Sequence, residues 1–273
     1  MRDRLTMLVA GIFAGAFLAG PAWADKVTFE DPTGDDNGPG AYVYPTDAVY
    51  SPGSFDLVEF EVEDKGKNVD FSVSVNSRLD DPWGMGVGFA VQMVFIFIDT
   101  DGATGSGHTD GLPGLNITFD PAHAWEKVVV ISPQQQSRVV AEARVKLAEK
   151  LAAGDVLVPR RTLGKGKTIS GRIAKEDIGS GDATKWGYQV VMQSNEGFPA
   201  KTDFLTRKVN EFEGQHRFGG GTDSDCDPHV MDILAPPATG SAEEVAGQHA
   251  QLAYECDLDG NASKPATLLT VRK

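Results

Sequence analysis

The sequence predicts an all-β protein, an antiparallel β-sandwich of the immunoglobulin-like kind, with a possible short helix. Residues 69–76 (VDFSVSVN) alternate apolar and polar side chains, the period of a strand with one buried and one exposed face. Residues 89–98 (FAVQMVFIFI) are almost wholly apolar, which indicates a central strand covered on both faces. Turn residues separate the candidate strands, and no strand-helix alternation indicates a parallel sheet.

The chain begins with a segment typical of a secretory signal. Two arginines precede an apolar run over residues 5–20, and Ala22-Trp-Ala24 has the small-x-small form after which a signal peptidase cleaves. The run is shorter than the ~20 residues of a membrane-spanning helix, which disfavours a transmembrane anchor. We therefore expect a signal peptide over residues 1–24 and a secreted or periplasmic protein that starts at Asp25.

The mature chain would form one domain. It would keep 249 residues, and no low-complexity linker divides residues 25–273. It would carry 23 basic and 38 acidic residues, a net charge of −15. Such a charge disfavours nucleic acid as a partner.

An irregular acidic segment, residues 31–57 (DPTGDDNGPGAYVYPTDAVYSPGSFDL), precedes the first convincing strand. Its prolines and glycines exclude a helix, and its large apolar side chains favour an ordered loop. Asp31, Asp35 and Asp36 offer hard oxygen ligands from a tight loop, which calcium prefers. We predict that these three residues bind calcium. The alternative is a solvated acidic turn that its own hydrogen bonds cap.

The other expected elements follow in chain order. Residues 55–63 should form a strand with a phase slip at Val58. Further strands are expected at residues 115–119, 125–132, 169–173 and 187–193. Residues 141–153 (AEARVKLAEKLAA) are rich in helix formers and could pair Glu142 with Lys146, which slightly favours a helix there.

Two further acidic stretches are less specific. Residues 99–110 begin like an EF-hand loop with Asp99, Asp101 and Gly102. The pattern then fails, because Ala103 stands where another Asp or Asn is needed and the twelfth residue is not Glu. A plain loop is favoured over a metal site here and at residues 223–227.

Only two cysteines occur, Cys226 and Cys256. An even count in an oxidising compartment predicts one disulfide between them. Metal-binding thiols and attached c-type haem find no support, because neither cysteine belongs to a CxxC or CxxCH motif.

The sequence contains no motif of the common catalytic families, neither GxSxG, HExxH, a P-loop nor a Rossmann glycine fingerprint. We therefore predict that the chain is not an enzyme.

Aromatic side chains are candidates for sugar binding, because flat rings stack on the apolar faces of sugars. Tyr42, Tyr44 and Trp83 lie in predicted loops and are the candidate ligand-binding residues. For Trp83, a ring that covers the end of the core is an equal alternative. Trp125 and Trp186 lie in predicted strands, which favours the core.

Residues 34–45 (GDDNGPGAYVYP), 81–101 (DPWGMGVGFAVQMVFIFIDTD) with 111–116 (GLPGLN), and 217–237 (RFGGGTDSDCDPHVMDILAPP) carry a family resemblance. Together they resemble the glucodextranase C-terminal module, a DOMON-like β-sandwich. This family accompanies bacterial and archaeal glycan-degrading enzymes and is regarded as a carbohydrate-binding or wall-attachment unit. The resemblance spans nearly the whole mature chain.

The chain also departs from the family pattern. Cys226 and His229 stand where small or amide residues are expected, and the helix-like segment is unfamiliar. No catalytic domain accompanies the module, so we expect it to act as a free exported domain. The resemblance implies a non-catalytic module that binds carbohydrate or cell-envelope glycan, and the acidic opening loop adds calcium as a candidate stabilising ion.

A haem protein is the alternative, since some DOMON-type sandwiches bind haem b between an axial Met and a His. The candidates would be Met85 or Met93 with His216 or His229. Met93 stands inside an apolar strand, which favours a packing role over haem ligation.

Overall fold

Two five-stranded sheets form the body of the protein in the computed structural model, which describes residues 25–147 and 153–273. The first sheet runs in the order β1 (Asp25–Glu30), β2 (Leu57–Asp64), β3 (Asn68–Val75), β9 (Thr168–Ala174) and β8 (Thr162–Lys165). The second runs β11 (Asp232–Ile233), β10 (Gly187–Ser194), β4 (Gln92–Asp99), β6 (Lys127–Ile131) and β7 (Val156–Leu157). Strand pairs within both sheets are antiparallel except β6 with β7. The predicted fold class is confirmed, whereas the predicted signal peptide lies outside the described residues.

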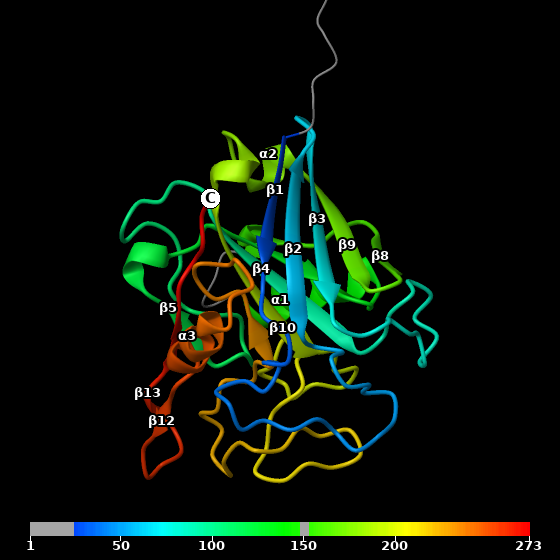
Figure 1. Ribbon diagram of the computed structural model, residues 1–273, viewed down its shortest axis with the longest axis vertical. Coiled ribbons are helices and arrows are strands. Elements are labelled where there is room, and N and C mark those ends of the chain that lie inside the picture. The colour runs from blue at the N-terminus through cyan, green and yellow to red at the C-terminus, as the bar shows by residue number, and fades with distance from the viewer. Residues whose placement is uncertain (1–24, 148–152) are drawn as a thin grey trace, which may run out of the picture.

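Shorter elements cover the outer face of the second sheet (Figure 1). β5 (Ile117–Phe119) pairs in parallel with β14 (Ala266–Leu268), and β12 (Glu255–Cys256) pairs with β13 (Ala262–Lys264). The α-helices are α1 (Gln136–Lys146), α2 (Lys175–Ile178) and α3 (Glu243–Gln251). The 3-10 turns are η1 (Pro121–His123), η2 (Ala153–Asp155) and η3 (Ala183–Lys185). Among the described helices, none is long and apolar enough to cross a bilayer.

The strand periods read from the sequence match the structure. Side chains of β3 alternate between half-buried and buried, with Val69 and Phe71 among those that face the other sheet. The pairing of β2 with β3 shifts register between Leu57 and Glu59, where the sequence indicates a phase slip. A β-bulge of this kind lets side chains on both sides of the slip keep the same buried face.

β4 is buried along its whole length because it separates two hydrophobic cores. Val94, Ile96 and Ile98 pack into the core between the two sheets. Met93, Phe95 and Phe97 point the opposite way, into a second core that β5, β14 and α1 help to cover. Burial on both faces explains why this strand reads as a continuous apolar run. Trp125 and Trp186 are buried in these cores, as predicted.

The helix α1 begins earlier than the sequence indicates, at Gln136 rather than at residue 141. It packs Val139, Ala143 and Leu147 into the second core, a spacing of four residues that places them on one helix face. The expected pair of Glu142 with Lys146 forms, at 2.9 Å. Residues 148–152 of the predicted helix lie outside the described residues.

Candidate functional site at the loop end of the sandwich

Two long loops, residues 31–56 and residues 195–231, lie together at one end of the strands (Figure 1, bottom). They share a third hydrophobic cluster and pair at an isolated bridge between Val43 and Gly219. The buried members of the cluster are Tyr42, Tyr50, Phe55, Val91, Val209, Phe218 and Met231. This packing gives the irregular opening segment a core of its own.

Tyr42 and Tyr44 fix the opening loop to its surroundings. Tyr42 is buried, and its hydroxyl donates to the Pro228 carbonyl at 3.0 Å. Tyr44 is half-buried, and its hydroxyl donates to the Asp36 carboxylate and accepts the Phe55 N–H at 2.9 Å. Both hydroxyls are therefore engaged within the protein.

Trp83 reaches the surface, with 38% of its area exposed. Its turn is held by the Asp81 carboxylate, which accepts the backbone N–H groups of Met85 and Gly86, each at 2.7 Å. The indole ring stands edge-to-face against two other rings, with centroids 6.2 Å from Tyr50 and 6.5 Å from His216. Trp83 is thus a surface ring supported from below by the loop cluster.

A shallow hollow of about 260 Å³ adjoins this aromatic group, and His216 belongs to both. Phe198 lines the hollow and is 94% exposed. Arg207 also lines it, pairs with Glu196 at 2.8 Å and lies 5.8 Å from the Tyr50 ring centroid. The lining residues are Glu196, Phe198, Pro199, Ala200, Asp203, Thr206, Arg207, Lys208, Asn210, His216 and Arg217. Aromatic rings beside hydrogen-bonding groups are the chemistry that sugar recognition needs.

A larger hollow, of about 910 Å³, lies at the β8–β9 edge. Polar and charged side chains such as Asp70 and Arg161 line it, and no aromatic ring does in the described part of the chain. The hollow at the β8–β9 edge is therefore a poorer match to sugar stacking than the loop end.

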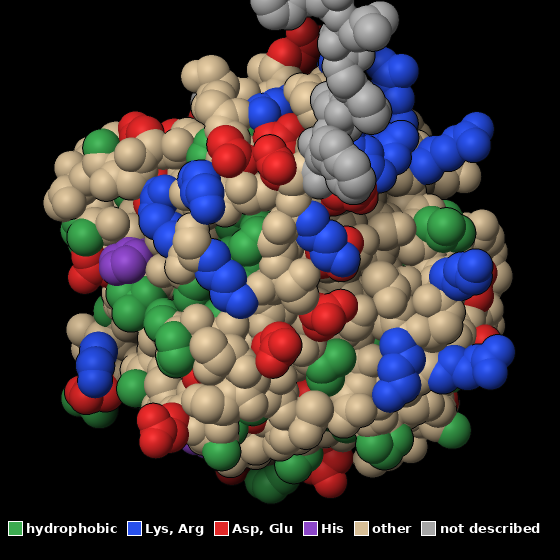
Figure 2. Space-filling model, turned by 45° about the horizontal axis from the view of Figure 1, so that its top comes forward, with side chains coloured by type: hydrophobic (Ala, Val, Ile, Leu, Met, Phe, Trp, Pro, Cys, Tyr) green, Lys and Arg blue, Asp and Glu red, His purple; other side chains and the backbone are tan. Residues whose placement is uncertain are grey.

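On the face of the molecule drawn in Figure 2, basic and acidic side chains are interspersed, and hydrophobic side chains lie in small groups.

A buried carboxylate cluster lies where β1, the opening loop and β11 meet. Asp31, Asp35 and Asp232 are 5%, 2% and 0% exposed, and one oxygen from each lies within 4.8 Å of the other two. Burial and the negative charge of Asp35 raise the pKa of Asp31 to about 9. Burial and the negative charge of Asp56 raise the pKa of Asp35 to about 7. Burial, followed by the charge of Asp31, raises the pKa of Asp232 well above its ordinary value.

Several oxygens of the cluster lack a hydrogen-bond donor. Neither carboxylate oxygen of Asp31 has a partner at hydrogen-bond geometry, although the backbone N–H of Ala235 lies near enough to favour its charged form, and one oxygen of Asp35 also lacks a partner. Asp56 and Glu244, whose charges add to the local field, each leave one buried oxygen without a partner. Their other oxygens are used, since Asp56 accepts the Gly34 N–H at 2.9 Å and Glu244 accepts backbone N–H groups of the loop before α3.

The structure brings together two of the three predicted calcium ligands, Asp31 and Asp35. The third, Asp36, accepts the Tyr44 hydroxyl, and Asp232 lies in the cluster in addition. Gln248 of α3 positions the group, because it donates to the Asp35 carbonyl and accepts the Ile233 N–H at 3.1 Å. An acid inside the apolar run at residues 230–235 is the sequence signal that could have identified Asp232.

The second acidic loop is explained by contacts within the protein. Asp99, Asp101 and Glu126 also lie within 4.8 Å of one another. Asp99 pairs with Arg272 at 2.6 Å, and Asp101 accepts the Ala103 N–H at 2.7 Å. Glu126 accepts the Thr100 N–H at 2.7 Å. These partners support the interpretation as a plain loop.

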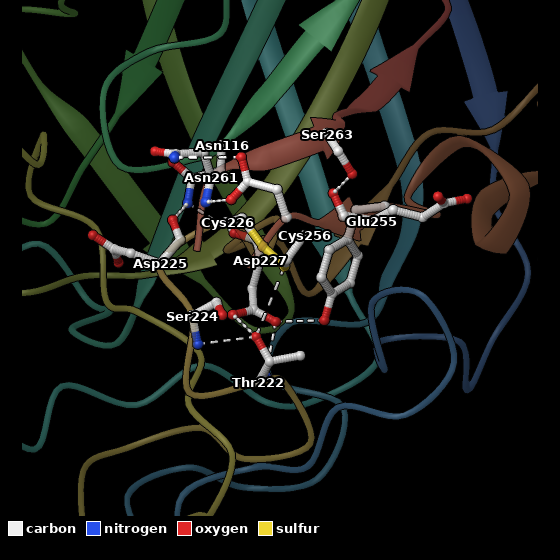
Figure 3. Close-up of a disulfide and its surroundings, with 12 residues drawn as sticks. Asn116, Thr222, Ser224, Asp225, Cys226, Asp227, Glu255, Cys256, Asn261 and Ser263 are labelled. Atoms are coloured by element: carbon white, nitrogen blue, oxygen red, sulfur yellow. Dashed lines mark hydrogen bonds between the residues drawn. A yellow bond between two sulfur atoms is a disulfide. The ribbon is translucent and has the colours of Figure 1, made fainter. Parts of the chain in front are cut away.

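The predicted disulfide joins Cys226 to Cys256, with 6.0 Å between the Cα atoms (Figure 3). Beside it, the buried Asp227 accepts the Thr222 N–H at 2.9 Å and the Tyr254 hydroxyl. Asn116 donates to the Asp225 and Asp227 carbonyls at 2.8 and 2.9 Å. The third acidic stretch is thereby tied to the β5 region and to the C-terminal hairpin.

The four haem-ligand candidates lie in different surroundings. Met93 is buried in the second core, and Met85 lies in the Trp83 turn. His216 is exposed beside Trp83, whereas His229 is buried and its Nδ1 accepts the Val209 N–H at 3.1 Å. The haem alternative stays a prediction, and the absorption spectrum of the purified protein tests it.

A two-sheet β-sandwich whose loop end carries supported aromatic rings has an architecture suited to a binding module. Residues 27–270 match the family described as the C-terminal binding module, SLH-like, of glucodextranase, and the chain belongs to this family. No curated protein matches the chain. The family is a binding module rather than a catalytic domain, and with the disulfide it indicates a secreted or cell-envelope location.

Proposed function

We propose that the protein is an exported, periplasmic or secreted module that binds carbohydrate or cell-envelope glycan without catalysis and is stabilised by calcium. The observation that carries the glycan part is the Trp83 ring, exposed at the surface and supported by Tyr50 and His216. Family membership supports a binding role of this kind.

The chemistry of the loop end suits a sugar chain. Trp83 and the exposed Phe198 offer apolar faces, and His216 stands next to both the Trp83 ring and the hollow that Phe198 lines. Arg207 and Asn210 of the same hollow offer donors for hydroxyl groups. Contiguous exposed apolar surface that polar residues surround marks interaction sites on soluble proteins.

The size of the hollow favours surface contact with a polymer over enclosure of a small molecule. Its volume of about 260 Å³ lies just below the ~300 Å³ at which enclosed ligand pockets begin. A short stretch of glycan would therefore lie across Trp83 and the hollow. Most of the polymer would stay in solvent.

A glycan-array screen of the mature protein, with and without calcium, tests the proposal. We expect binding to a restricted set of poly- or oligosaccharides. Cell-envelope material that contains at least one of these glycans should also retain the protein. Absence of binding to every glycan, in both calcium and chelator, would refute the glycan function. The same sample serves for the absorption spectrum, in which a Soret band would favour haem instead.

A further inference from the structure

The geometry points to a single divalent-cation site, of the calcium class, formed by Asp31, Asp35 and Asp232. Compared with the calcium ligands predicted from the sequence, this set contains Asp232 in place of Asp36. It rests on the proposed function only in its calcium component, because its three carboxylates are buried and none of them lines the hollow beside Trp83.

The first argument is the lack of partners. Asp31 is 5% exposed, neither of its carboxylate oxygens accepts a hydrogen bond, and one of them lies within 4.8 Å of an oxygen of Asp35 and of Asp232. A buried carboxylate without a donor is costly, so buried charges in proteins are paired or coordinate metals. One oxygen of Asp35 is in the same situation.

The second argument is charge. Asp56 and Glu244 add their carboxylates to the field at Asp31, which makes five acids in one buried region. Within residues 25–147 and 153–273, no Lys, Arg or His forms an ion pair with any of the five. A doubly charged cation is the simplest counter-charge for such a group.

The third argument is distance and ligand type. Oxygens bound to one calcium ion lie about 2.3–2.6 Å from it and therefore at most about 5 Å from each other. The three oxygens here lie within 4.8 Å of one another. An all-oxygen set favours calcium or magnesium over zinc, whose protein sites usually include nitrogen or sulfur ligands. Calcium is preferred over magnesium, because magnesium usually keeps several of its water ligands.

The Asp99 loop provides an internal contrast. Its three carboxylates are equally close together, but Arg272, backbone N–H groups and a serine hydroxyl satisfy them. Asp101 is exposed as well. In that loop, partners within the protein stabilise the clustered carboxylates, whereas the Asp31 carboxylate has no partner at hydrogen-bond geometry.

A cation at this position would join two segments that are far apart in the chain. Asp31 follows β1 directly, Asp35 lies in the opening loop, and Asp232 begins β11, where it also accepts the Leu57 N–H at 2.7 Å. Helix α3 closes over the same region through Gln248, which contacts the Asp35 carbonyl. The ion would therefore attach the first strand and the opening loop to the second sheet.

Metal content and binding test the site directly. The mature protein with its disulfide intact is treated with chelator, and calcium chloride is then titrated by calorimetry, with native mass spectrometry for stoichiometry. We expect one calcium ion per chain and a higher melting temperature in calcium than in chelator. Asp31→Asn and Asp232→Asn should weaken calcium binding at least 100-fold, whereas the control Asp101→Asn should leave it unchanged.

A second readout separates a metal site from a merely structural carboxylate. In chelator, Asp31→Asn should melt at or above the wild-type temperature, because the neutral amide needs neither a proton nor a counter-charge at this buried position. A destabilised Asp31→Asn protein that still binds calcium like wild type would overturn the inference. So would wild-type protein that binds no calcium at millimolar concentration and melts identically in calcium and chelator. Neither measurement uses glycan, so failure here leaves glycan binding untouched, and failure on the array leaves this site untouched.

Discussion

The hydroxyl of Tyr44 donates a hydrogen bond to the carboxylate of Asp36, and this contact connects the acidic part of the opening loop to its aromatic part. The Tyr44 ring packs edge-to-face on Phe55, with 5.2 Å between centroids. Phe55 in turn contacts Tyr50, which supports Trp83. One continuous set of contacts thus runs from the carboxylate region to the surface ring.

Tyr44→Phe should destabilise the protein, because it leaves the Asp36 carboxylate and the Phe55 N–H without their shared partner. The expected loss is about 1–3 kcal/mol in the free energy of unfolding, measured by urea denaturation. Tyr254→Phe is the matched comparison. It removes the hydroxyl that donates to the Asp227 carboxylate, but Asp227 keeps its hydrogen bonds from Thr222 and is not left without a donor. If the midpoint of urea unfolding is the same for Tyr44→Phe and wild type, the Tyr44 hydroxyl does not stabilise the loop.

Reduction of the Cys226–Cys256 disulfide should also destabilise the protein. The bridge closes a segment of 30 residues, and chain entropy alone predicts a loss of about 3–4 kcal/mol. Calorimetry with and without reductant measures the change in melting temperature. A Cys226→Ala, Cys256→Ala variant should match the reduced protein and show no response to reductant. Equal melting temperatures for oxidised and reduced wild type would contradict the prediction.

Acid should weaken the fold through Asp64, which is 8% exposed between β2 and α2. Burial raises the pKa of Asp64, but the Lys175 ammonium and the N–H groups of Ala183 and Gly66 outweigh burial and hold it below its ordinary value. A carboxyl whose pKa is lower in the folded state contributes stability above its unfolded pKa of about 4. This contribution is lost as pH falls through the folded pKa.

The buried Asp31 cluster, whose pKa values are raised, contributes an opposite slope, but the contribution of Asp64 should make the free energy of unfolding fall as pH drops from about 5 to 3. Asp64→Asn should reduce this slope, whereas Asp177→Asn, at an exposed position of α2, should keep it. Urea denaturation at several pH values measures both slopes. Identical slopes for wild type and Asp64→Asn would show that Asp64 is not responsible.

The sequence predicts the sandwich well because strand patterns are local. The alternation in β3, the apolar run of β4 and the slip at Val58 each reflect which face of one strand is buried. Helix α3 was missed although Ser241 and Glu244 have capping-box spacing, and the Glu244 carboxylate does accept the Ser241 N–H at 3.1 Å. Gly247 and the polar composition of the segment obscured the helix.

The candidate sites are less predictable, because they depend on which loops meet in space. Asp36 stands beside Asp35 in the chain, yet Asp232 is the residue that joins Asp31 and Asp35. In the same way, Phe198 and His216 lie far from Trp83 in sequence, and only the fold places His216 beside both the Trp83 ring and the hollow that Phe198 lines. Local spacing identifies Asp31 with Asp35 but carries no information on the residues from other segments that join them.

The most direct test of the account is the affinity of Trp83→Ala for the best glycan of the array, measured by calorimetry against wild type. We expect a loss of about 1–3 kcal/mol in binding free energy with little change in melting temperature, because the ring is a surface contact. Phe212→Ala, which removes another exposed ring that does not line the hollow, should bind like wild type. Unchanged affinity of Trp83→Ala, with or without a lower melting temperature, would contradict the proposed glycan site.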